Sequence, residues 1–174
     1  MKTYNLEDIK KLTKNNSNYM DDDVTDLKKS YSIDDFDKAK TRILKYIFYK
    51  KRSENEVRKK FSKEFDEYLL DDIIENLKEN GYINDEDYIE RSINEFVTLK
   101  HLSIREMKYK LMAKGVNSSK IERYIENNEE QLLEYEIQSA KYYVNKKRAQ
   151  KEDFEIRRYL MKKGYKEESI KEAM

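Results

Sequence analysis

The sequence contains no cysteine, no proline, only three glycines and a single histidine. The absence of cysteine excludes disulfide bonds and thiolate metal sites within this sequence. The sequence also contains no GxGxxG or Walker-type run, which excludes the common glycine-rich loops that hold nucleotide phosphates. No stretch is long and apolar enough to cross a membrane, and the first residues, MKTYNLEDIK, lack an apolar signal core. We therefore expect a cytoplasmic protein that does not contact a membrane.

No arrangement of residues typical of an enzyme is found. His101 is the single histidine, and no cysteine or known motif accompanies it. Carboxylates are numerous, but lysines lie at pairing distance from them along the sequence, so no general acid and base can be assigned. We expect no catalytic residue, no cofactor and no metal ligand, and hence a protein that is not an enzyme.

Charged residues are abundant but balanced. They form 42% of the 174 residues, with 37 Lys and Arg against 36 Asp and Glu, whereas hydrophobic residues form 37%. This balance excludes a protein-wide positive field that would draw the chain onto nucleic acid. The high charged fraction favours several thin layers of amphipathic helices over one large core.

One segment of the sequence occurs three times. SIREMKYKLMAKGVNSSKIERYI at 103–125 recurs as EDFEIRRYLMKKGYKEESIKEAM at 152–174, and a weaker copy, SENEVRKKFSKEFDEYLLDDII, lies at 53–74. Gly115 and Gly164, in the first two copies, are 49 positions apart. A period of about 50 residues is typical of an array of similar helical units.

The repeated segment contains signals for helix starts and helix ends. Ser53 with Glu56, and Ser103 with Glu106, fit the capping box, in which the two side chains satisfy free backbone amides at a helix start. In the third copy Asp153 is the expected cap. Each of the three glycines follows a helical run and precedes an apolar residue, which is the pattern of a helix that ends in a left-handed glycine.

The spacing of apolar residues predicts an all-α fold of three tandem three-helix repeats in an elongated or curved array. In the first expected helix Phe36, Ala39, Ile43 and Ile47 follow one another at intervals of three or four residues. The expected organisation is a mobile N-terminal leader at 1–33, followed by repeats at 34–82, 83–128 and 129–174.

Charges of one sign are grouped along the sequence although their total is near zero. Residues 67–90 hold nine acidic side chains and one base, whereas residues 141–166 hold ten bases and three acids. In the aligned repeats, the position after the first buried residue of the second helix is Arg58, Lys108 and Arg157. Either these charges are ordinary solvated helix surface, or a cationic column follows a long partner that is polyanionic or alternates in charge.

Four motifs, taken in order, resemble the RecX regulatory family. They are RSENEV at 52–57, NGYINDEDYI at 80–89, KLMAKGV at 110–116 and YLMKKGY at 159–165, and the resemblance covers about 34–174. It implies three tandem three-helix repeats and a protein without catalytic residues that binds the RecA recombinase filament. Such a protein modulates, and usually inhibits, strand exchange and ATP hydrolysis in DNA repair, recombination and the SOS response. The sequence departs from many relatives by having Lys100-His101-Leu102 in place of a glycine-rich entry to the second repeat, and by its acidic middle.

On this resemblance, we expect a monomeric array that lies in the groove of a RecA–DNA filament, with weak direct binding to nucleic acid. One alternative is a helix-turn-helix-like, DNA-binding transcriptional regulator, although the net charge of +1 is low for a protein that binds duplex DNA. Another is a plain structural scaffold. The residues expected to contact the filament or its DNA are Arg52, Arg58, Arg105, Lys108, Lys114, Arg157, Arg158, Lys162 and Lys163.

Overall fold

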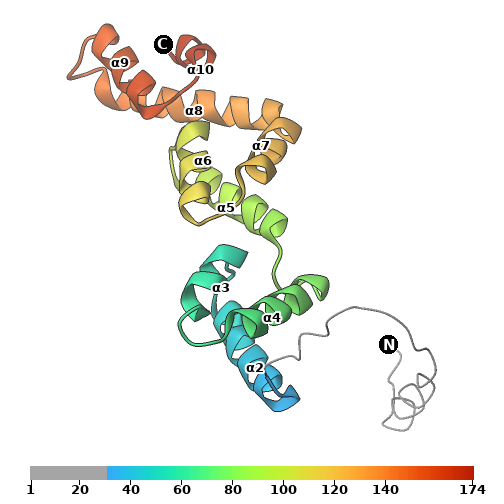
Figure 1. The fold of residues 1–174 in the computed structure, drawn as a ribbon. Helices are drawn as coiled ribbons and strands as arrows, with labels where there is room; N and C mark the ends of the chain where they lie inside the picture. The colour runs from blue at the N-terminus through green and yellow to red at the C-terminus, as the bar shows by residue number, and fades with distance from the viewer. Residues whose placement is uncertain (1–30) are drawn as a thin grey trace.

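The computed structural model describes residues 31–174, so nearly all of the expected leader at 1–33 lies outside the described residues (Figure 1). Within residues 31–174 every regular element is an α-helix, which confirms the expected all-α class. Figure 1 shows these helices following one another along an elongated array. They are α2 (Ile33–Tyr49), α3 (Glu54–Phe61), α4 (Glu67–Glu79), α5 (Asp85–Leu99), α6 (Ile104–Ala113), α7 (Ser118–Asn127), α8 (Glu129–Lys147), α9 (Asp153–Lys163) and α10 (Glu167–Ala173).

Three of the described helices have a serine as their N-cap residue. Ser32, Ser53 and Ser103 each accept a hydrogen bond from the backbone N–H three residues later, at 3.1, 3.2 and 3.1 Å, and the acidic residue at that position accepts from the serine N–H. The expected capping boxes at Ser53 and Ser103 are confirmed. The expected cap at Asp153 is wrong, because Glu152 occupies the N-cap position of α9 and no side chain caps this helix. Asp153 is the first helical residue, where its charge complements the helix dipole.

In the described part of the chain, three helices end at a glycine with a left-handed backbone, as expected. The φ angle is +72° at Gly81, +76° at Gly115 and +89° at Gly164, a region that glycine enters without the steric cost of a Cβ atom. The residue after each glycine donates its backbone amide to the carbonyl of the residue five positions before that donor, at 2.8 to 3.3 Å. This bond closes the helix end as a Schellman motif and turns the chain toward the next helix.

Within residues 31–174 the buried apolar side chains form three clusters, and each cluster holds a trio of helices together. The first cluster, in which Ile43 and Leu77 are fully buried, joins α2, α3 and α4. The second joins α5, α6 and α7 and includes Leu132 from the start of α8. The third joins the rest of α8 to α9 and α10. Because each fully buried Leu or Ile stabilises the fold by roughly 1.5–3 kcal/mol, these clusters are the main source of stability within each trio.

The expected boundaries between the repeats stay a prediction, although each of the three clusters holds three successive helices together. Ile83 packs in the first cluster, next to the expected boundary at 82 and 83. Leu132 packs in the second cluster, and α8 continues without a break from there into the third. A short turn at 80–84 therefore separates the first two trios, whereas a continuous helix links the second trio to the third.

Candidate partner-binding surface

The cations of the expected column lie on the second helix of each trio, and each one is paired within its own trio. Each faces a carboxylate on the helix that follows, in a half-exposed setting where an ion pair contributes about 0–1 kcal/mol. A partner that binds these cations must therefore compete with carboxylates of this chain. The pairs are Arg58 with Asp71, Lys108 with Glu122, and Arg157 with Glu167 at 2.7 Å.

Arg52 is mostly occupied by packing. Its guanidinium lies over the ring of Tyr46, 4.5 Å from the ring centre, and 3.7 Å from the carboxylate of Glu56. Only 20% of its side chain is exposed. A cation over an aromatic face, with a carboxylate beside it, stabilises the passage from α2 to α3. Arg52 consequently presents little charge to a partner.

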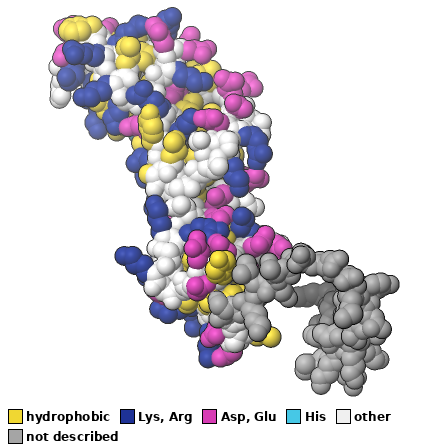
Figure 2. Space-filling view, in the orientation of Figure 1, with side chains coloured by type: hydrophobic (Ala, Val, Ile, Leu, Met, Phe, Trp, Pro, Cys, Tyr) yellow, Lys and Arg dark blue, Asp and Glu magenta, His cyan; other side chains and the backbone are white. Residues whose placement is uncertain are grey.

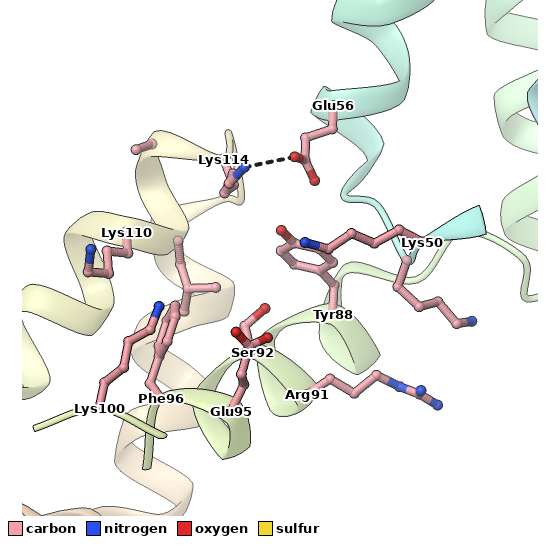
Figure 3. Close-up of a pocket in the computed structure, with 13 residues that line it drawn as sticks. Lys50, Glu56, Tyr88, Arg91, Ser92, Glu95, Phe96, Lys100, Lys110 and Lys114 are labelled. Carbon is pink, nitrogen blue, oxygen red and sulfur yellow. Dashed lines mark hydrogen bonds and ion pairs between the residues drawn. The ribbon is translucent and has the colours of Figure 1, made fainter. Parts of the chain in front are cut away.

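The first joint connects the start of α3 to the end of α6. The hydroxyl of Ser53 donates to the carbonyl of Lys114 at 2.8 Å, and the ammonium of Lys114 lies 3.0 Å from the carboxylate of Glu56 (Figure 3). Gly115 lies directly against Asn55, since a Cβ atom at Gly115 would be 2.2 Å from Asn55 Cγ. The positive end of one helix dipole therefore meets the negative end of another at this joint.

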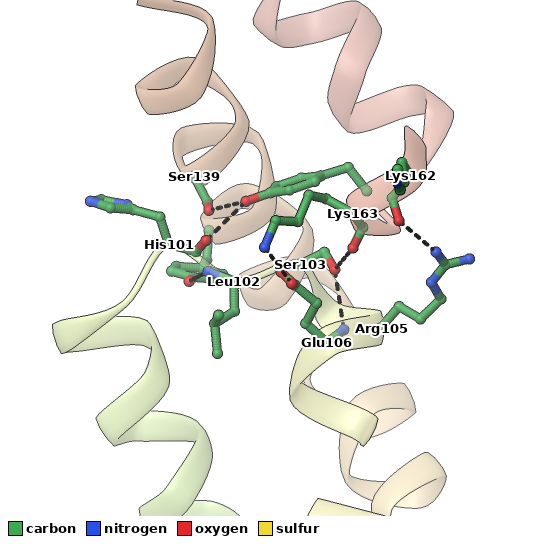
Figure 4. Close-up of polar contacts among 10 residues, drawn as sticks. His101, Leu102, Ser103, Arg105, Glu106, Ser139, Lys162 and Lys163 are labelled. Atoms are coloured by element: carbon green, nitrogen blue, oxygen red, sulfur yellow. Dashed lines mark hydrogen bonds and ion pairs between the residues drawn. The ribbon is translucent and has the colours of Figure 1, made fainter. Parts of the chain in front are cut away.

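The second joint repeats this design between α6 and α9. The hydroxyl of Ser103 donates to the carbonyl of Lys163 at 2.7 Å, and the ammonium of Lys163 lies 2.8 Å from the carboxylate of Glu106 (Figure 4). In addition, Arg105 Nη2 donates to the carbonyl of Lys162 at 3.2 Å. Equivalent serines, carboxylates and lysines thus hold each trio to the next.

The ionisation of the joint residues responds to burial and pairing. Partial burial alone would raise the pKa of Glu56, but hydrogen bonds from Lys114 and from a backbone amide outweigh it, and the pKa of Glu56 is lowered. At the second joint, the hydrogen bond to Glu106 raises the pKa of Lys163. Burial, followed by the nearby charge of Glu56, raises the pKa of Tyr88 to about 12. The ion pairs of both joints are therefore favoured at neutral pH.

A fully buried carboxylate, Glu136 on α8, completes the second joint, and it is not among the residues predicted from the sequence. It accepts hydrogen bonds from the amide of Ile104 at 2.8 Å, the amide of Lys166 at 3.0 Å and the hydroxyl of Ser169 at 2.7 Å. It thereby connects α8 to the first turns of α6 and α10. Its burial has a signal in the sequence, because buried apolar residues lie four positions before and four positions after it.

Arg158 and Lys162 on α9 are the expected contact residues whose charges are most available. Both are exposed, and no ion pair holds either side chain within residues 31–174. Figure 2 shows Lys and Arg side chains gathered over the end of the array that contains α9. The nine expected residues thus fall into three groups: cations paired within a trio, residues of the joints or of the packing, and exposed cations. Their contact with a partner stays a prediction.

Across residues 31–174 no helix is long and apolar enough to span a membrane. The same part of the chain contains no group of three or more histidine, aspartate or glutamate residues that could hold a metal ion.

The sequence is similar to several regulatory proteins named RecX, although no family model matches it. It is 32% identical over 135 residues to regulatory protein RecX of Staphylococcus carnosus, a match that covers 75% of this chain and 51% of that protein. It is 30% identical over 151 residues to regulatory protein RecX of Clostridium perfringens, with 82% of this chain and 70% of that protein covered. The chain therefore spans about half the length of the first relative and more of the second.

Solved structures have the same fold. The crystal structure of RecX from Lactobacillus salivarius superimposes with a TM-score of 0.68 at 23% identity, covering 79% of this chain and 93% of that one. A second crystal structure of a regulatory protein RecX superimposes with a TM-score of 0.69 at 21% identity. The sequence relatives and the shared arrangement of helices lead to one conclusion: this chain belongs to the RecX family.

Proposed function

We propose that this chain binds the RecA–DNA filament and inhibits strand exchange and ATP hydrolysis by the recombinase. Its membership of a family whose relatives are named regulatory proteins is the observation that carries this proposal. In this role the protein acts in the cytoplasm, as a monomer without catalytic residues of its own, during DNA repair and recombination.

The two joints support a role in which the protein follows a periodic partner. They connect three helix trios in series through equivalent hydrogen bonds and ion pairs. A filament presents the same surface at regular intervals, so successive trios can contact successive subunits. No single contact needs to be strong, because linked units raise one another's effective concentration. Contact across neighbouring subunits would favour filament disassembly or block pairing with duplex DNA.

We assign direct contact with the partner first to Arg158 and Lys162, whose charges are exposed and have no ion pair within residues 31–174. The half-exposed cations that pair within a trio come next, because surface ion pairs are weak and can be exchanged for a partner's anions. Lys114 and Lys163 act indirectly, by holding the trios in place.

The test is the ATPase activity of RecA on single-stranded DNA while this protein is titrated in. Wild type is expected to inhibit at micromolar concentration, and Arg158→Glu/Lys162→Glu is expected to need roughly ten times more protein, because like charges then face each other at the contact. The matched control, Lys45→Glu/Lys171→Glu, makes the same charge change at exposed lysines without ion pairs in the described chain. If wild type has no effect at micromolar excess, the proposal is wrong.

A second candidate function is a helix-turn-helix-like transcriptional regulator that binds duplex DNA. It predicts tight binding to bare duplex with a steep dependence on salt. The filament regulator instead binds bare duplex weakly and RecA-coated DNA strongly. In a transcriptional regulator of this kind, the turn after α6 would have to lie near the duplex. In this structure α3 already covers the end of α6 through Ser53 and Asn55. This contact favours the filament regulator.

A further inference from the structure

A cleft of about 420 Å³ lies at the first joint, bordered by the end of α2, by α5 and by α6 (Figure 3). Lysines stand on opposite sides of its opening, with Lys100 and Lys110 on one side and Lys50 on the other. Between them lie the rings of Tyr88 and Phe96. The cleft is therefore a hollow with cationic walls and aromatic side chains in its lining.

The three lysines have no acidic partner in the described chain. Lys50, Lys100 and Lys110 are exposed, and no ion pair holds any of them within residues 31–174. The ammonium of Lys100 lies 5.4 Å from the centre of the Phe96 ring. Glu95 also lines the cleft and is exposed, so one carboxylate offsets part of this charge. The net charge of the cleft lining stays positive, and three ammonium groups are available to bind an anion.

The remaining cations around the cleft are already paired. Arg91 lies 2.9 Å from Asp87, and Lys51 lies 3.8 Å from the same residue. Lys114 is held by Glu56 in the first joint. The donors left for a ligand are therefore lysine ammonium groups and not guanidinium groups.

The second joint has the same framework, which allows a comparison within one molecule. Asp85 on α5 and Glu136 on α8 are 51 residues apart. Asp85 accepts a hydrogen bond from the amide of Glu54, the first residue of α3, at 3.0 Å. Glu136 accepts one from the amide of Ile104, the first residue of α6, at 2.8 Å. Ile93 and Val144, also 51 residues apart, are both buried. Positions at the two joints can therefore be matched residue by residue.

Aromatic rings occupy the corresponding space at the second joint. His101 stacks on Tyr142 with 3.7 Å between ring centres, Tyr142 contacts Tyr143 at 5.3 Å, and Tyr143 contacts Tyr159 at 5.6 Å. Three cations and a serine in place of four rings leave the first joint hollow, and Lys110 is the one of these cations without an ion pair in the described chain, because Lys51 and Arg91 pair with Asp87. The matching residues of the first joint are Lys51, Arg91, Ser92 and Lys110.

We propose that this cleft binds the phosphate backbone of a single-stranded nucleic acid. Lysine ammonium groups are compact charges that suit phosphate oxygens, whereas carboxylates are best matched by the planar fork of arginine. A positive groove with aromatic faces is also the way in which proteins bind single strands without sequence preference. The aromatic rings of Tyr88 and Phe96 in the lining favour a single strand over a duplex, because the bases of a single strand are free to stack on them. The inference rests on the proposed function for the source of the strand, the DNA of the filament.

The first test measures binding of a fluorescent oligothymidylate to the full chain by anisotropy at several salt concentrations. Lys50→Gln/Lys100→Gln/Lys110→Gln is expected to weaken binding roughly tenfold and to lower the salt slope by about 2, since each phosphate contact with a single strand contributes about 0.7. The control, Lys45→Gln/Lys63→Gln/Lys171→Gln, removes the same charge from exposed lysines outside the cleft and should leave the affinity nearly unchanged. Equal losses in the two variants would overturn the cleft as the site.

A second variant keeps every charge and fills the hollow. Ser92→Tyr introduces at the first joint the ring that Tyr143 provides at the second, so it is expected to weaken strand binding while the circular dichroism spectrum stays the same. Wild-type affinity in a folded Ser92→Tyr protein would overturn the proposal. Polyglutamate that competes better than unlabelled oligothymidylate of equal charge would also overturn it, because the cleft would then suit an acidic protein segment.

The inference and the proposed function can fail separately. If wild type inhibits RecA and the cleft variants bind the oligonucleotide normally, the cleft is wrong and the proposed function stands. If wild type binds the oligonucleotide through the cleft but leaves RecA ATPase activity unchanged, the proposed function is wrong and the cleft stands.

Discussion

The hydroxyl of Ser103 donates a hydrogen bond to the carbonyl of Lys163 at 2.7 Å, across 60 residues of sequence. The same buried hydroxyl accepts from the amide of Glu106 at 3.1 Å, so one oxygen atom both caps α6 and joins it to α9. Ser53 has the same two contacts in the first joint. The start of a helix and the attachment of the next trio are thus coupled through a single side chain.

Ser103→Ala is expected to lower the free energy of unfolding by about 2 kcal/mol, half from the lost cap and half from the lost bond to Lys163. Ser32→Ala is the matched control, because Ser32 caps α2 with the same capping box but is exposed and lies outside both joints. It should cost only about 1 kcal/mol. Urea denaturation followed by circular dichroism measures both variants, and equal costs would contradict the double role of Ser103.

Gly115→Ala is expected to destabilise the protein more than Gly81→Ala. Both glycines have a positive φ, so each substitution costs about 1–2 kcal/mol in backbone strain. A Cβ atom at Gly81 meets nothing within 4 Å, whereas one at Gly115 would lie 2.2 Å from Asn55 Cγ and force the first joint apart. The extra cost at Gly115 is about 1–3 kcal/mol. Thermal melting of the two variants checks this, and the same melting temperature for both would show that the joint tolerates the added atom.

Most helix starts and ends could be predicted from the sequence because they depend on residues within one turn. The capping box of Ser53 and the left-handed backbone at Gly115 are of this kind. The wrong cap at Asp153 is an exception, since Glu152 occupies the N-cap position there. The joints could not be predicted in this way. Ser53 and Lys114 are 61 residues apart, and no local pattern distinguishes a serine that caps only its own helix from one that also holds another helix.

The candidate contact residues were predicted from charge and repeat position, and these properties do not reveal pairing. Arg58 and its partner Asp71 lie 13 residues apart on different helices, so their contact depends on how α4 packs against α3. Glu136 shows the converse case. Its charge suggests an exposed position, but its place on the apolar stripe of α8 and three donors from other elements explain its burial.

Glu136→Ala is expected to lower the free energy of unfolding by about 3 kcal/mol, because two backbone amides and the hydroxyl of Ser169 lose their acceptor in a buried setting. Glu134→Ala, on the same helix, is the control, since Glu134 is exposed and no ion pair holds it within residues 31–174. Urea denaturation should show a change of less than about 0.5 kcal/mol for Glu134→Ala. A similar small change for Glu136→Ala would mean that Glu136 is not needed at the second joint.

Acid is expected to weaken the first joint through Glu56. Its pKa is lowered in the folded protein, so the folded state favours the carboxylate more than the unfolded chain does. The resulting stability is fully present above the ordinary glutamate pKa of 4.5 and is lost as the pH falls through the lowered pKa of the folded state.

The measurement that isolates this contribution is the free energy of unfolding of wild type and of Glu56→Gln between pH 7 and pH 3. At pH 7 wild type should be more stable by about 1 kcal/mol, and the difference should shrink toward the acid end of the range. The free energy of unfolding of Lys114→Gln should change less with pH than that of wild type. The ammonium of Lys114 lies 3.0 Å from Glu56 and lowers the pKa of Glu56, and the variant lacks this ammonium. A wild-type advantage that is constant from pH 7 to pH 3 would mean that the carboxylate of Glu56 stabilises the joint through its shape and neutral hydrogen bonds and not through its charge.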